Sequence, residues 1–150
     1  MHIGKQQYEE ITSQITVELQ GDCLLLAPKE NLRTPLPPLV ETVSEWPKVD
    51  DNQIFNSILS IGSLASAEKL SELLQKLRSH SNMETRLYFC DRTIRDRPKI
   101  KSSLHDITGA LWEANWSVIK CGRFTIGENR HSPKYAYGIA RVKRSIEANL

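Results

Sequence analysis

The chain has 150 residues, the size of one domain, and its hydrophobic content of 39% and charged content of 25% are typical of a globular protein. No apolar run approaches the roughly 20 residues of a membrane span, and the first residues lead into polar sequence rather than an apolar signal core. These features argue against a membrane-spanning or exported chain, and they predict one cytoplasmic domain, residues 1–150, with no membrane partner.

The three cysteines, Cys23, Cys90 and Cys121, are isolated from one another in the sequence. An odd total without a Cys-x-x-Cys pair argues against a disulfide framework, and the spacing of the histidines gives no set of metal ligands. We therefore expect no metal site. Each cysteine lies in a strand-like run, where a buried free thiol is the expected state.

Residues 1–50 form a short lead-in. Apolar spacing predicts a short helix over Lys5–Gln14, and Ile15–Leu19 and Cys23–Ala27 are strand-like. Gly21 and Asp22 either form a tight turn between two strands or simply precede one buried strand.

A proline-rich connector follows, with Pro35, Pro37 and Pro38 within four residues. Proline at this density prevents regular structure. The next segment, Leu39–Trp46, is compatible with a short helix or with a short edge strand at Val40–Val43. The connector then delivers the chain into the segment on which the fold prediction depends.

That segment, Gln53–Arg92, has the pattern strand, helix, strand. Apolar runs at Ile54–Ile61 and Thr85–Cys90 flank an amphipathic pattern over Leu64–Arg78, which a serine cap at Ser63 or Ser66 is expected to begin. Two short apolar runs joined by a helix predict a right-handed crossover in a parallel sheet.

The last third predicts a helix and a hairpin. The helix starts with a cap at Ser102 or Ser103 and a capping carboxylate at Asp106, and strands over Trp116–Ile126 and Tyr135–Lys143 form an antiparallel hairpin. Along the first of these strands, Trp116, Val118, Gly122, Phe124 and Ile126 are expected to face one side. Residues 144–150 are a tail. The predicted buried stripe of the helix is Leu104, Ile107, Leu111, Trp112 and Ala114.

A basic loop follows the strand that ends at Cys90. Residues 1–90 hold 8 Lys+Arg and 12 Asp+Glu, whereas residues 91–144 hold 12 and 5. Ligands of open α/β sheets bind beyond the carboxyl ends of the strands, so this loop is the best-placed candidate for binding phosphate or a partner. A solvated basic face is the alternative. The predicted binding residues are Arg95, Arg97, Lys99 and Lys101, with Lys120, Arg123, Arg130, Lys134, Arg141, Lys143 and Arg144 as possible members of the same face.

The order of elements resembles the carboxyl-terminal two-thirds of a class I S-adenosylmethionine-dependent methyltransferase domain. The resemblance covers residues 51–143 and rests on a strand like Phe55–Ser60, a leucine-rich helix like Leu70–Leu77, a strand like Arg86–Cys90 and the run Ala114–Val118. It implies an α/β fold of three layers, a truncated Rossmann-like methyltransferase fold in which a mostly parallel sheet ends in an antiparallel hairpin. In that family the corresponding strand end faces cofactor or substrate. A surviving pocket would be bordered by Ser60, Gly62, Ser63, Asp91 and Arg92.

The chain departs from the family pattern in its lead-in. The family has a strand-helix-strand-helix-strand lead-in, for which 50 residues are too few, and a glycine-rich turn after its first strand, where this chain has Pro28–Asn31 without glycine. The sequence therefore predicts an incomplete cofactor site. The N-terminal domain of anamorsin-type iron–sulfur assembly proteins is a comparable case of a methyltransferase-like domain without that site.

Three functions are compatible with this pattern. The first is a methyltransferase-like interaction or regulatory module, a pseudoenzyme that holds no conventional S-adenosylmethionine and pairs with a protein partner or with a second copy. The second is an active methyltransferase with an atypical site, and the third is a nucleic-acid or phosphate-binding protein that uses the basic third. No catalytic group is identified, because the neighbours His105 and Asp106 would point about 100° apart on a helix.

Overall fold

A computed structural model describes residues 14–26, 36–64, 67–92, 107–125 and 134–144. Within these ranges lies one six-stranded sheet with the strand order β2-β1-β3-β4-β6-β5. Strands β1 to β4 are parallel, and β6 runs antiparallel to both β4 and β5. The elements are β1 (Gly21–Leu26), β2 (Val40–Glu45), β3 (Ser57–Ile61), α2 (Leu70–Ser79), β4 (Arg86–Arg92), α3 (Ile107–Glu113), β5 (Trp116–Thr125) and β6 (Lys134–Val142).

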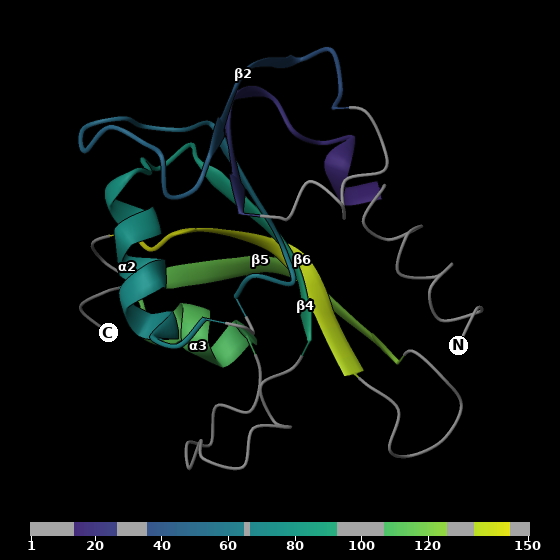
Figure 1. Cartoon of the computed structure of the whole chain (residues 1–150). Coiled ribbons are helices and arrows are strands. Elements are labelled where there is room, and N and C mark those ends of the chain that lie inside the picture. Colours follow the sequence, from purple (N-terminus) through teal and green to yellow (C-terminus); the bar gives the residue numbers. More distant parts are fainter. Residues whose placement is uncertain (1–13, 27–35, 65–66, 93–106, 126–133, 145–150) are drawn as a thin grey trace.

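This arrangement confirms the predicted α/β class and the mostly parallel sheet that ends in an antiparallel hairpin. Helices α2 and α3 lie together on one face of the sheet (Figure 1). In the described parts of the chain, no helix is long and apolar enough to cross a membrane.

The face covered by the helices carries the larger core, here called the helix-side core. Alternate residues of β1, β3, β4, β5 and β6 point into it, because successive side chains of a strand leave on opposite faces. Its fully buried members include Leu24, Ile58, Leu74, Phe89, Leu111 and Trp116.

The opposite face carries a second apolar cluster, the far-side core, which includes Ile15, Leu19, Cys23, Leu59, Tyr88 and Cys90. Residues 14–16 are helical and a turn follows, so the prediction of a strand over Ile15–Leu19 is wrong. Ile15 and Leu19 are four residues apart, and one helical turn brings both onto the same side, against the sheet. The helix predicted over Lys5–Gln14 lies outside the described residues except for its last position.

The lead-in contains two strands among its described residues, β1 and β2, and β2 is the outermost strand of the sheet. The structure thus selects the edge strand from the two interpretations of Leu39–Trp46. Between β2 and β3 the chain crosses the helix side, where Trp46 and Val49 pack against the helix-side core. Ile54 is 41% exposed, so β3 begins at Ser57, later than predicted.

Helix α2 also begins later than the sequence pattern predicts. Its N-cap is Lys69, with no side-chain capping hydrogen bond. Ser63 does not cap the helix, because its hydroxyl donates to the carbonyl of Leu26 at the end of β1. Ser66, the alternative cap, lies outside the described residues. Leu64 is nevertheless fully buried in the helix-side core, although it precedes the helix.

Trp112 and Trp116 have opposite environments. Trp116 is fully buried, and its Nε1–H donates to the carbonyl of Leu74 at 3.0 Å. Trp112 is 53% exposed, so its predicted place in the buried stripe is wrong. The reason is helical geometry: Leu111 faces the sheet, and the next residue of α3 points about 100° away from it.

Strand β5 contains an irregularity that the sequence pattern hides. The pairing register with β6 shifts between Val118 and Lys120, which is a β-bulge. Val118 packs against the helix-side core, whereas Gly122 pairs with Tyr137, whose side chain packs against the far-side core. The predicted single register along this strand is therefore wrong beyond the bulge.

The three cysteines differ in exposure: Cys23 and Cys90 are buried, as predicted, whereas Cys121 is exposed, which corrects the prediction. Burial raises the pKa of the Cys23 thiol to about 12. Burial, and then the nearby charge of Asp91, raises the pKa of the Cys90 thiol to about 12. Cys121 is the thiol that solvent reaches directly.

We expect iodoacetamide at pH 8 to label one thiol of the native protein rapidly, and peptide mass spectrometry to locate the label at Cys121. A pKa about three units above the ordinary value lowers the thiolate fraction of a buried thiol roughly a thousandfold, and the thiolate is the reacting form. The variant Cys121→Ser should lose the rapid label. Equal labelling rates at all three positions in the native protein would contradict the described burial.

Candidate functional site

The carboxyl ends of the parallel strands form the edge where a ligand site is expected. From β1 the chain continues to β2 on one side, and β3 lies on the other side. The point between β1 and β3 is therefore a topological switch point, and open α/β sheets bind their ligands in the crevice beyond such a point. Of the residues that the structure describes, those beside this point come from the end of β1 and from the turn after β3.

The turn after β3 is tied to both neighbouring strands. The Ser63 hydroxyl donates to the carbonyl of Leu26, the last residue of β1, and the backbone N–H of Gly62 donates to the carbonyl of Cys90 in β4 at 2.9 Å. A contact from Ser63 to Leu26 joins the two strand ends that border the crevice. The protein itself thus engages the carbonyl at the end of β1.

Gly62 is the one open position of this turn. Its φ of +80° is a conformation that side chains rarely adopt, and a Cβ placed there would meet no atom within 4 Å. The residue is exposed, so its bare backbone faces open space.

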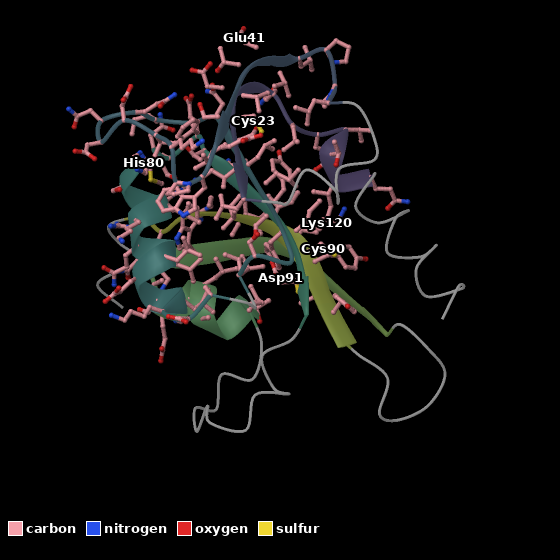
Figure 2. All side chains as sticks on the ribbon, viewed as in Figure 1. Cys23, Glu41, His80, Cys90, Asp91 and Lys120 are labelled. Atoms are coloured by element: carbon pink, nitrogen blue, oxygen red, sulfur yellow. The ribbon has the colours of Figure 1, made fainter. Side chains whose placement is uncertain are left out.

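Behind this turn, Ser60 and Asp91 approach each other in the interior. The Ser60 hydroxyl donates to Oδ2 of Asp91 at 3.5 Å, and neither residue is exposed. They lie two positions beyond Ile58 and Phe89, so strand alternation places both on the helix side. Figure 2 labels Asp91 beside Cys90 towards the end of β4. A buried carboxylate requires polar partners, and Ser60 supplies one.

The five residues predicted to border a pocket come from the end of β3, the turn after it and the end of β4, and they differ in solvent exposure. Ser60 and Asp91 are buried against each other, while Gly62 and Ser63 form the turn above them. Arg92 ends β4 and pairs there with Tyr135 of β6. A cofactor-binding role for these residues stays a prediction.

The basic face is only partly described. Arg95, Arg97, Lys99 and Lys101 lie outside the described residues, as does Arg130. Of the others, Lys120 and Arg144 are exposed and Arg141 is half-buried. They share one carboxyl-terminal region, on or just after β5 and β6.

Lys143 does not belong to a phosphate-binding face. It is 7% exposed, its Nζ donates to the carbonyl of Trp112 at 2.5 Å, and the same atom lies 3.5 Å from the centroid of the Trp112 ring. The ammonium is held by a carbonyl and by a cation–π contact, so it serves the packing of α3 on the sheet. No local sequence pattern indicates this pairing, since the two residues are 31 positions apart.

Within the described ranges, no group of three or more His, Cys, Asp or Glu side chains is placed to hold a metal ion.

The outer strand β2 forms a second surface. From the sequence alone, this segment is compatible with either a short helix or an edge strand. Its residues from Glu41 to Val43 are exposed, and it carries acidic side chains at Glu41 and Glu45. A strand with so little burial has no hydrophobic periodicity by which the sequence could identify it.

A parallel sheet with a crossover helix on one side and a carboxyl-terminal antiparallel pair defines the class of fold, a class I methyltransferase-like α/β fold. Comparison with solved structures gives the same class. No protein-family model matches the sequence, and no curated protein matches it.

Three solved structures illustrate the likeness. The N-methyltransferase NodS from Bradyrhizobium japonicum WM9 has a TM-score of 0.62 at 8% identity, over 94% of this chain and 97% of that one. A putative S-adenosylmethionine-dependent methyltransferase from Listeria monocytogenes has a TM-score of 0.61 at 10% identity, over 96% and 100%. The [4+2]-cyclase SpnF has a TM-score of 0.61 at 11% identity, over 90% and 80%. At these identities the likeness concerns the fold alone.

Proposed function

We propose that this chain is a methyltransferase-like domain that does not hold S-adenosylmethionine in the conventional way and that acts as an interaction or regulatory module. The observation that carries the proposal is the contact of the Ser63 hydroxyl with the Leu26 carbonyl, which joins the ends of β1 and β3. A conventional cofactor would have to occupy the crevice at that place.

The residues around the crevice fit the cofactor poorly. A close approach of ligand to backbone requires glycine, and the sequence contains none between Gly21 and Gly62. Gly62 offers open backbone, but its N–H already donates to Cys90. Ser60 and Asp91, the polar groups nearest to the turn, are fully buried.

The fold does not decide between the rival activities. A [4+2]-cyclase and an N-methyltransferase both resemble this chain at a TM-score above 0.6, and one fold carries many chemistries. The choice therefore rests on the crevice, and an active methyltransferase would need it open.

Isothermal titration calorimetry tests the proposal. With S-adenosylmethionine and with S-adenosylhomocysteine, we expect no saturable heat up to about 1 mM ligand, a limit that corresponds to roughly −4 kcal/mol of binding free energy. An established methyltransferase in the same buffer serves as the positive control. Saturable binding of either compound in the micromolar range would overturn the proposal and favour an active enzyme with an atypical site.

A further inference from the structure

Among the described residues, no strand pairs with the outer edge of β2, and most residues of this strand are exposed. It forms one margin of the sheet at the top of Figure 1, paired on one side with β1. Val43 is 47% exposed, and Leu39, just before the strand, is 67% exposed. Figure 2 shows Glu41 at the outer margin of the molecule. A strand in this position presents backbone donors and acceptors to any extended chain that lies beside it.

The register identifies which backbone groups point outward. The N–H of Trp46 donates to the carbonyl of Leu25 in β1 at 2.9 Å. Along a strand, the backbone groups of successive residues alternate between the two sides, so Ser44 and Thr42 also face β1. The N–H and C=O of Val43 consequently point away from β1, toward the open side.

The opposite margin of the sheet is built differently. Edge strand β5 has a bulge between Val118 and Lys120, and Lys120 itself is exposed. Bulges and lysines are the usual devices that prevent pairing at an edge. Strand β2 carries no lysine, and the irregularity in its own pairing with β1 lies at its start, between Val40 and Thr42; from Thr42 to Glu45 the pairing is regular. Its outer side therefore offers a regular length of strand.

The charge around β2 is acidic. Described residues 36–56 contain Glu41, Glu45, Asp50 and Asp51 against Lys48 alone. Glu45 shares the face of Val43, because side chains two positions apart share a face, and Glu41 lies at the irregularity that precedes Thr42. An antiparallel pair of two copies centred on Val43 would bring Glu41 of each copy toward Glu45 of the other, and like charges close together destabilise a pair.

We infer that β2 binds an extended, basic segment of a partner protein by strand addition, with backbone hydrogen bonds to Val43 and cationic side chains beside Glu41 and Glu45. Main-chain bonds supply affinity in this mode, and alternate side chains supply specificity. The inference rests on the proposed function, since it names a surface through which an interaction module acts.

Fluorescence anisotropy with labelled synthetic peptides tests the inference. The probes are a peptide of alternating lysine and threonine, the corresponding glutamate and threonine peptide, and the lysine peptide with its backbone amides N-methylated. Of the three peptides, we expect only the unmethylated lysine peptide to bind saturably, and we expect added salt to weaken its binding. N-methylation keeps the charge of the peptide and removes its backbone donors. If the methylated peptide bound as tightly as the lysine peptide, charge attraction without strand pairing would explain the binding, and the inference would be overturned.

The protein variants locate the binding edge. Val43→Pro removes the outward N–H and is expected to weaken binding about tenfold, whereas Val43→Thr keeps that N–H and should bind like the natural chain. Proline is tolerated on an edge strand when its nitrogen faces solvent, and an unchanged melting temperature checks this. Glu41→Lys should also lose binding. Full binding by Val43→Pro would overturn the inference.

Two further outcomes are decisive. If the natural chain forms a dimer that Val43→Pro dissolves, the occupant of the edge is a second copy, and the basic partner is refuted. The peptide titration is independent of the cofactor titration: binding of S-adenosylmethionine would refute the proposed function, whereas failure of the lysine peptide would refute only the role of β2.

Discussion

Replacement of Trp116 with alanine is expected to lower the free energy of unfolding by about 3–5 kcal/mol, the usual cost of removing a large buried aromatic side chain. Trp116 is fully buried in the helix-side core, between α3 and the sheet. Its loss leaves a cavity and also leaves the Leu74 carbonyl without the indole donor that lies at 3.0 Å. Because Leu74 lies within α2, its carbonyl keeps the helical backbone bond, so the cavity accounts for most of the cost. Urea denaturation monitored by circular dichroism measures the change.

Trp112 provides the matched control, four residues earlier in the chain. It is 53% exposed, and its contact with the Lys143 ammonium is the main interaction that Trp112→Ala would remove. We expect a loss of about 1 kcal/mol for that variant. The loss of unfolding free energy for Trp116→Phe should fall between those of the two alanine variants, because phenylalanine fills part of the cavity but cannot donate to the Leu74 carbonyl. Equal losses for the two alanine variants would contradict the assignment of Trp116 to the core.

Replacement of Gly138 with alanine is expected to destabilise the protein by about 3 kcal/mol, at the upper end of the usual cost of overpacking. A Cβ at this position would lie 2.0 Å from the carbonyl oxygen of Lys120, which is a backbone atom of the β5 bulge. Backbone atoms cannot rotate out of the way as the end of a side chain can. The bulge would have to rearrange, or β5 and β6 would have to separate locally.

Gly122→Ala is the control for this prediction, in the same pair of strands. Its Cβ would lie 2.4 Å from the end of the Tyr137 ring, and that side chain can move. We expect a cost of about 1 kcal/mol, again measured by urea denaturation. If Gly122→Ala were as destabilising as Gly138→Ala, the bulge would not be the reason that position 138 requires glycine.

The central crossover and the final hairpin were predictable from sequence because their signal is strong hydrophobic periodicity. The segments Ile54–Ile61, Leu64–Arg78 and Thr85–Cys90 predicted β3, α2 and β4 in the right order, although both β3 and α2 begin later than expected. Helix starts are poorly specified when a buried residue such as Leu64 continues the apolar spacing beyond the helix.

Other features depend on tertiary contacts that a local pattern does not contain. The bulge at β5 depends on how β6 pairs with it, and the burial of Lys143 depends on Trp112. For the candidate site, the sequence grouped Ser60, Gly62, Ser63 and Asp91 at one strand edge; the structure brings Ser60 and Asp91 into contact, and the binding role of the four residues stays a prediction. It did not reveal that the Ser63 hydroxyl contacts Leu26, because that partner lies 37 residues away.

The proposed function rests mainly on the contact of Ser63 with Leu26 between the ends of β1 and β3. A methyltransferase-like sheet with this crevice bridged by Ser63 retains the scaffold and offers other surfaces for binding. The surface of the acidic outer strand β2 is the one for which we infer a ligand. Its exposed residues, its outward backbone groups and its negative charge favour an extended basic segment.

The most direct test of the proposed function is a nuclear magnetic resonance titration of ¹⁵N-labelled protein with S-adenosylmethionine, observed at the amides of Gly62, Ser63 and Cys90. We predict that these resonances stay in place up to about 1 mM ligand, where even weak binding of roughly −4 kcal/mol becomes visible. Saturable shifts at these three amides would show that the cofactor enters the crevice, and they would contradict the proposed function.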